Sequence, residues 1–352
     1  MRRLLIVSHR WVALIVGLVL LITSASGAVL VFENAIDRAL NPSLWHVTPS
    51  AAPLSIDTLA ARVHAQLPGA PPASVNLSEE PDRAWTMSAG SLTVFVNPYT
   101  GSVNGTRTAA QSRETLARRL HVLHVELFAG KLGRSIVGVV DAIALFLVIT
   151  GLFLWWPDKL LRINTRASWK RINFDLHHVI GVLAAIVLIV ITASGLLVHY
   201  EGLSALVLTL DSTAPAAMIA QPANPTPTGP PSFDAMAAVA RTALPGATVM
   251  FIALADDKRP VTVAMRFPED HTPAGRSRVF INRWNGAVLN TIDTRKAGVG
   301  TRIDNLKRSL HTGDVLGKPT ATLWFLATLA MLSQIVSGVL MWWNARRGRK
   351  KK

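Results

Sequence analysis

Four histidines of this chain occupy two positions that each occur twice along the sequence. His9 and His177 stand at the start of two long apolar segments. His124 and His311 stand shortly before two others. Imidazoles that face each other from different helices are suited to bind one metal centre from opposite sides. Taken singly, each ring has a simpler interpretation, an interfacial histidine bonded to headgroups or water; its duplication favours ligation.

The duplication runs through the whole chain. Residues 123–157 match residues 310–344 at an offset of 187. The first apolar segment matches the third at an offset of 168, and the stretches between match at 177 and 185. The matched residues are His9 with His177, Ser26-Gly27 with Ser194-Gly195, His124 with His311, Gly130 with Gly317, Gly151 with Gly338, and Trp155-Trp156 with Trp342-Trp343. The matches keep their order, so we predict two parallel repeats with binding sites between the halves.

Four apolar stretches are long enough to cross a membrane: residues 11–32, 135–156, 177–200 and 319–343. Half of all residues are hydrophobic, and Asp141 is the only formally charged side chain inside these stretches. The predicted fold is therefore a membrane all-α four-helix bundle built from two tandem repeats. Asp141 is a candidate for a proton-carrying role, or it hydrogen-bonds a neighbour while neutral.

The net charge of +15 does not indicate a nucleic-acid-binding protein. Residues 1–10, 157–175 and 345–352 hold 14 of the 36 lysines and arginines, whereas the two long loops are nearly balanced in charge. Short basic segments mark the cytoplasmic side of a membrane. We therefore expect cytoplasmic termini, and long loops that face outward.

The first 30 residues also resemble a cleavable signal peptide, but the apolar run is long and has a counterpart deeper in the chain, which favours a retained helix. The chain has no cysteine, which excludes disulfides, iron–sulfur clusters and covalently attached haem.

Each outward loop is predicted to form a small α+β domain. The first has a helix at 55–66 and strands at 73–77, 84–87 and 92–97; the second has a helix at 233–243 and strands near 248–254, 261–267 and 278–282. Units of this size are marginal alone, so we expect them to lean on each other or on the membrane helices. The predicted segments are helix one (1–34), the first outward domain (35–113), an interfacial helix with helix two (114–157), a cytoplasmic loop (158–175), helix three (176–201), the second outward domain with a Pro-rich linker at 214–231 (202–300), an interfacial helix with helix four (301–344) and a basic tail (345–352).

The motifs together resemble a known family. The outward turn VFVNPYTGSV, at 94–103, is similar to that of PepSY domains. The helical motifs HRW, DLH, LHVELFAGKLG and TGLFLWWP resemble the PepSY-associated transmembrane (PepSY-TM) family. Characterised relatives include inner-membrane reductases that use haem b to reduce siderophore-bound iron, so the resemblance implies a bacterial inner-membrane location and a haem cofactor.

The expected site consists of two non-covalent haem b groups, held by His9, His177, His124 and His311. His199 is the leading substitute ligand because it lies near the face of His177, and His121 and His178 are further alternatives without support from the repeat. Gly17, Gly27, Gly181 and Gly195 would let helices or a flat macrocycle approach closely. A histidine-lined metal site without porphyrin is the competing interpretation.

We expect an inner-membrane electron carrier of the oxidoreductase class that reduces ferric iron or a ferric siderophore in the periplasm. No hydrolase, nucleotide-phosphate, flavin or NAD motif is present, so electrons come from a quinol or a cytoplasmic reductase. No catalytic residue is assigned beyond the ligands, and membrane lipid is the expected surrounding. The alternative is a non-enzymatic membrane-anchored PepSY module that binds or restrains a periplasmic peptidase.

Overall fold

The computed structural model describes residues 1–349 apart from residues 51, 158, 160, 212–231 and 255–258. The predicted Pro-rich linker at 214–231 therefore lies outside the described residues. The chain divides into two compact units. We call them the helical unit (Met1–Glu33, Ala117–Val207 and Leu306–Lys352) and the sheet unit (Asn34–Leu116 and Leu208–Asn305).

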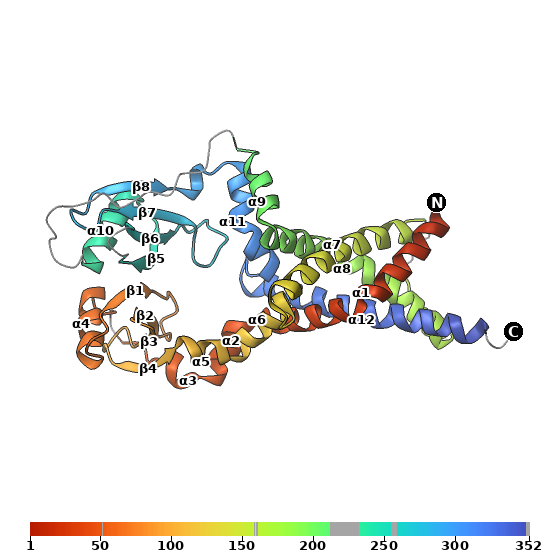
Figure 1. Ribbon diagram of the computed structural model, residues 1–352, viewed down its shortest axis with the longest axis horizontal. Helices are drawn as coiled ribbons and strands as arrows, with labels where there is room; N and C mark the ends of the chain where they lie inside the picture. Colours follow the sequence, from red (N-terminus) through yellow and green to blue (C-terminus); the bar gives the residue numbers. More distant parts are fainter. Residues whose placement is uncertain (51, 158, 160, 212–231, 255–258, 350–352) are drawn as a thin grey trace. The chain divides into compact units, whose positions relative to one another are not determined.

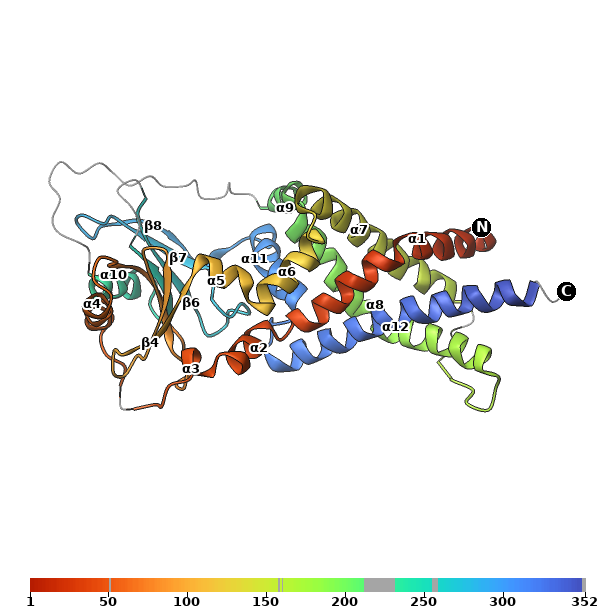
Figure 2. The same cartoon turned by 60° about the horizontal axis from the view of Figure 1, so that its bottom comes forward.

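Four long apolar helices dominate the helical unit: α1 (Arg2–Leu30), α7 (Gly130–Trp155), α8 (Trp169–His199) and α12 (Lys318–Arg349). Each is long and apolar enough to cross a membrane, so the chain is a multi-pass membrane protein with four candidate spans. The first turn of α1 and the last turn of α12 lie at the same end of the bundle (Figure 2). We call this the terminal end.

The four spans close into a ring in which each helix packs against two others, in the order α1, α7, α8, α12. Small and aliphatic side chains from all four helices fill the middle of the ring, among them Leu20, Ala144, Leu188 and Ala327. The outward faces carry exposed leucines and isoleucines, as a helix in contact with lipid requires.

Shorter helices adjoin the spans. They are α6 (Leu116–Glu126) before α7, α9 (Glu201–Leu208) after α8, and α11 (Val299–Thr312) before α12. The turns from α6 into α7 and from α11 into α12 pass through Gly130 and Gly317, whose φ angles of 56° and 71° favour glycine.

Helix α8 begins at Trp169, well before the start predicted from hydropathy at His177. Its first turns contain polar residues that bond to a neighbouring helix. The buried Asn173 donates from Nδ2 to the Ser337 carbonyl of α12 at 3.0 Å. Asp175 also pairs with Arg171 at 2.8 Å. A hydropathy pattern detects only the apolar part of such a helix.

The sheet unit contains one antiparallel sheet of eight strands, in the order β4-β3-β2-β1-β5-β6-β7-β8 (Figure 1). The strands are β1 (Pro72–Asn76), β2 (Trp85–Ala89), β3 (Leu92–Val96), β4 (Val103–Thr108), β5 (Thr248–Ala253), β6 (Val261–Arg266), β7 (Ser277–Ile281) and β8 (Val288–Ile292). The helices are α2 (Glu33–Leu40), α3 (Pro42–Trp45), α4 (Ile56–Gln66), α5 (Ala109–Glu114) and α10 (Phe233–Ala243), with a 3₁₀ turn η1 (Thr294–Lys296).

The two predicted α+β units, which were expected to lean on each other or on the membrane helices, form a single sheet. Strand β1 pairs antiparallel with β5, and Val75 lies opposite Ile252, its own counterpart at the repeat offset of 177. Joining the halves here satisfies two strand edges that separate domains would leave open. Helices α4 and α10 contribute Leu59 and Ala237 to one shared hydrophobic core.

Helices α4 and α10 also cap each other's N-termini. The Asp57 carboxylate accepts from the backbone N–H of Phe233 at 2.7 Å and of Asp234 at 3.2 Å. The Asp234 carboxylate accepts from the backbone N–H of Ile56 at 3.0 Å and of Asp57 at 2.9 Å. Each half of the sheet unit thus supplies the capping acid of the other half.

This reciprocal capping predicts that Asp57→Ala lowers the free energy of unfolding by about 1–2 kcal/mol, the usual cost of a lost N-cap. Thermal unfolding of the full chain in detergent measures the effect, with the exposed Glu269 changed to alanine as the control. Equal unfolding temperatures for the two variants would contradict it.

Burial alone raises the pKa of Asp234, but the bonds from the Asp57 and Ile56 N–H groups outweigh burial and hold that pKa below its ordinary value. The stabilisation is therefore present above pH of about 4 and is lost as the pH falls further.

Candidate functional site

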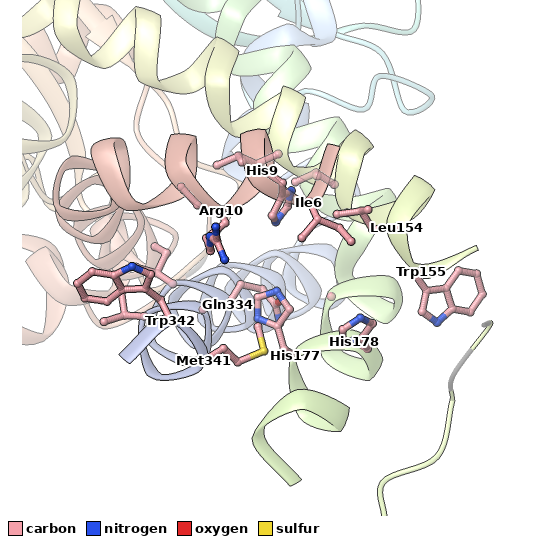
Figure 3. A pocket seen from close by; sticks show the side chains of 18 of the residues that line it. Ile6, His9, Arg10, Leu154, Trp155, His177, His178, Gln334, Met341 and Trp342 are labelled. Atoms are coloured by element: carbon pink, nitrogen blue, oxygen red, sulfur yellow. The ribbon is translucent and has the colours of Figure 1, made fainter. Parts of the chain in front are cut away.

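His9 and His177 lie at the terminal end of the bundle, on α1 and α8. Both line a cavity of about 430 Å³ to which all four spans contribute side chains. Figure 3 shows the two imidazoles extending into this space from opposite sides. The volume is in the range of about 300–1,000 Å³ that is typical of sites for cofactors and other small molecules. We call it the terminal cavity.

Each of these two rings hydrogen-bonds a hydroxyl through Nδ1. His9 Nδ1 lies 2.9 Å from Thr150 Oγ1, and that hydroxyl is 2.8 Å from the Phe146 carbonyl. His177 Nδ1 lies 2.7 Å from Ser337 Oγ, which is 3.2 Å from the Gln334 carbonyl. A hydroxyl that donates its one proton to the helix carbonyl accepts from the ring, and Nδ1 then carries the hydrogen. In that tautomer the lone pair of each ring is on Nε2.

His124 on α6 and His311 on α11 form a second pair. Their ring centres are 6.1 Å apart, with 47° between the ring planes. Two imidazoles that bind opposite faces of one metal, each at about 2 Å, have ring centres about 6 Å apart. The observed separation fits that arrangement.

This second pair has the same tautomer as the first. His124 Nδ1 donates to the Thr23 carbonyl at 2.8 Å, and His311 Nδ1 donates to the Ile191 carbonyl at 2.9 Å. Carbonyls only accept, so both lone pairs again lie on Nε2. Thr23 and Ile191 are counterparts at the offset of 168, just as Thr150 and Ser337 are at 187. The repeat therefore extends to the hydrogen bonds that orient the histidines.

A glycine lies against each of the four rings. A Cβ placed on Gly151 or Gly338 would lie 3.7 Å from Cε1 of His9 or His177. A Cβ on Gly27 or Gly195 would lie 3.0 Å from His124 Cε1 or 2.9 Å from His311 Cε1. Of the glycines singled out by the sequence, Gly27 and Gly195 thus make room for imidazoles. Gly17 and Gly181 face Ile335 and Gln334 instead.

Burial and the neighbouring His311 ring lower the pKa of His124, and burial lowers that of His311. Both imidazoles are consequently neutral at neutral pH, which is the form that binds a metal.

The three alternative ligands have different surroundings. His199 packs against Gly138 of α7 and meets Tyr200 edge to face with ring centres 4.6 Å apart. His121 lies one turn before His124, where burial and then the charge of Arg118 lower its pKa. His178 lines the terminal cavity beside His177, with ring centres 6.0 Å apart, and donates from Nδ1 to the Phe174 carbonyl at 2.9 Å. Of the three, only His178 adjoins a duplicated histidine in the cavity.

Asp141 breaks the symmetry of the second pair. A Cβ on Gly195 would lie 2.6 Å from Asp141 Oδ2 as well as close to His311. The three atoms nearest a Cβ on Gly27 all belong to His124. The counterpart of Asp141 in the other repeat is Thr328. A carboxyl group therefore lies beside His311 and has no equivalent beside His124, and its proton-carrying role stays a prediction.

The donor set fits a group that needs two axial imidazoles better than a bare metal ion. Within the described residues, no cluster of three or more His, Cys, Asp or Glu side chains could hold an ion. At the terminal cavity, two imidazoles, mostly apolar walls and glycines at the rings suit a flat macrocycle such as haem. The residues present therefore fit haem.

Sequence reasoning missed several polar residues of the site. Thr150 and Ser337 were detectable, because both are hydroxyl residues directly before the duplicated Gly151 and Gly338. Arg10 and Gln334 also line the terminal cavity. The repeat does not mark them, because neither residue is duplicated: their counterparts are His178 and Leu147.

Comparison with known proteins identifies a family but no named relative. No curated protein matches the chain. The model of the PepSY-associated TM region matches residues 7–345, which is nearly the whole chain and includes all four duplicated histidines. The protein therefore belongs to the PepSY-associated TM region family.

Proposed function

We propose that this protein is a haem b oxidoreductase of the bacterial inner membrane that carries electrons outward and reduces ferric iron or a ferric siderophore. One observation carries the proposal: the four duplicated histidines are grouped in two pairs, and every Nδ1–H is engaged while every Nε2 lone pair is left for a metal. His9 and His177 would hold one haem in the terminal cavity. His124 and His311 would hold the other.

The chain's own groups prepare both sites. The hydroxyls of Thr150 and Ser337 and the carbonyls of Thr23 and Ile191 hold the rings in orientation, as hydrogen-bond partners of ligand histidines do. The apolar side chains lining the terminal cavity exclude water. When bound, haem b supplies one-electron redox chemistry.

The spacing of the two sites supports transfer across the membrane. His9 and Gly27, which contacts the ring of His124, are 18 residues apart on α1, and His177 and Gly195 are 18 residues apart on α8. This is about 27 Å of helix, close to the thickness of a hydrocarbon core of about 30 Å. One centre therefore lies toward each end of the bundle.

The basic residues of 1–10, 157–175 and 345–352 support a cytoplasmic terminal end and a periplasmic sheet unit. Electrons then enter at the His9–His177 site from a quinol or a cytoplasmic reductase. They leave from the His124–His311 site to the ferric substrate. Membrane lipid surrounds the four spans.

A reduced-minus-oxidised spectrum of the purified protein, after expression with excess haem, tests the proposal. We expect b-type Soret and α bands and a pyridine haemochrome value of about two haems per chain. Absence of these bands would overturn the proposal in favour of a non-enzymatic PepSY module that restrains a periplasmic peptidase. Bound metal without a haemochrome would instead indicate a histidine site without porphyrin.

A further inference from the structure

We propose that Arg10 is the anchor for a carboxylate of the ligand in the terminal cavity, and that it fixes which edge of that ligand faces the terminal end. The inference rests on the proposed function, in which the ligand is haem b and the carboxylates are its two propionates. Arg10 would act as a binding and orienting residue alongside the two histidines.

The wall of the terminal cavity carries positive charge. Arg2 and Arg10 line the terminal cavity, and none of the described residues that line it is an aspartate or glutamate. Arg10 lies about 12 Å along α1 from Arg2, directly before the apolar stretch of residues 11–32, and its side chain is partly buried. A partly buried guanidinium on an apolar cavity is stabilised by an anion that faces it.

Within the described part of the chain, Arg10 has no such anion. Its Nε is buried without a hydrogen-bond partner, and its guanidinium carbon lies 5.8 Å from the centre of the neighbouring Trp11 ring. Figure 3 shows the Arg10 side chain beside the imidazoles of His9 and His177. A guanidinium that lines a cavity of this volume suits the carboxylate of a bound molecule, with which it forms paired charge-assisted hydrogen bonds.

A second donor points to the same ligand chemistry. Gln334 Nε2 is buried without a hydrogen-bond partner, and the residue lines the same cavity. The hydroxyls of Thr150 and Ser337 are already engaged with the histidines. Arg10 Nε and Gln334 Nε2 are thus two unsatisfied donors in one mainly apolar cavity. A ligand with an apolar body and oxygen acceptors on one edge would satisfy both donors.

Both donors break the symmetry of the two repeats. The counterpart of Arg10 is His178, and the counterpart of Gln334 is Leu147, which packs in the central hydrophobic cluster. The two ligand histidines, in contrast, are equivalent and cannot distinguish one edge of a macrocycle from another. Orientation must therefore come from the asymmetric groups.

The test compares two macrocycles that differ only in their carboxylates. Full-length protein with His124 changed to alanine, produced without haem, is reconstituted with ferric protoporphyrin IX or with its dimethyl ester, and the dissociation rate of each is measured by transfer to apomyoglobin. The variants are Arg10→Gln, Arg10→Lys and Gln334→Leu. Arg3→Gln, an exposed arginine of α1 outside the cavity lining, is the matched control.

We expect Arg10→Gln to speed the loss of the free acid by about tenfold, as for a lost hydrogen bond to a charged group, and to leave the loss of the ester unchanged. Arg10→Lys should be intermediate, Gln334→Leu should give a smaller effect of the same selectivity, and Arg3→Gln should give none. Unchanged ester binding also shows that the variant is folded.

Equal effects of Arg10→Gln on acid and ester would mean a packing role or a pairing with lipid phosphate, and would overturn the inference. No effect on either macrocycle would overturn it as well. If the protein with all its histidines retains neither macrocycle, the proposed function fails and the inference falls with it.

Discussion

Replacing His124 by alanine is expected to remove one of two haem groups and leave the other spectroscopically unchanged. His124 and His311 face each other at 6.1 Å, and each ring is held by a backbone carbonyl. Without His124, His311 would be the one histidine of this pair left to hold the haem, so the site would bind it more weakly. The pyridine haemochrome should fall from about two to about one haem per chain, and a redox titration should lose one of two transitions.

The control for His124→Ala is His199→Ala. His199 packs on Gly138 and Tyr200, so its removal should leave both haems in place. A second check uses His124→Gly, whose missing side chain leaves space for free imidazole. Adding imidazole during reconstitution should restore the second haem if the ring of His124 supplies a bond to the metal. Two haems in the unrescued His124→Ala variant would contradict the assigned pairing.

The four spans and the duplicated histidines were predictable because both depend on local or repeated features. An apolar run of sufficient length indicates a span by itself. The duplication left open which histidines pair. Equivalent residues of two parallel repeats lie around a common axis, which accounts for the closeness of His124 and His311 in the structure.

The continuous sheet was not predictable to the same extent. Pairing of β1 with β5 joins Val75 to Ile252 across about half of the chain, and a strand pattern does not reveal its partner. Strands β4 and β8 were missed because their residues lack the apolar alternation that marks a half-buried strand. Both are edge strands, with one partner each.

The supporting residues of the site were missed for a related reason. Thr150 acts on His9 from another helix, so its role depends on how α1 packs against α7. Gly27 and Gly195 were expected at a close approach, but the sequence did not say what approaches. In the structure it is the edge of an imidazole, and beside Gly195 also the Asp141 carboxylate.

The glycine at position 195 leads to the second large expected effect: Gly195→Ala should displace His311 and abolish or shift the His124–His311 centre. A Cβ there would lie 2.6 Å from Asp141 Oδ2, 2.9 Å from His311 Cε1 and 3.1 Å from His311 Nδ1. The carboxylate can rotate away at low cost. The ring cannot, because it is tied to the Ile191 carbonyl at 2.9 Å. The added methyl group therefore breaks that bond or turns the ring.

The matched control is Gly17→Ala on α1, where the new Cβ would lie 3.8 Å from Ile335 Cγ2, an ordinary contact. We expect Gly17→Ala to keep both haems at unchanged potentials. We expect Gly195→Ala to lose or shift one centre while the His9–His177 centre, 18 residues away on α8, stays intact and shows that the protein is folded.

Combining Gly195→Ala with Asp141→Ala separates the two contacts. Recovery of the centre would assign the effect to the carboxylate, and persistence of the defect would assign it to the ring. An unaltered spectrum in Gly195→Ala itself would mean that His311 does not bind the metal from the position it has here.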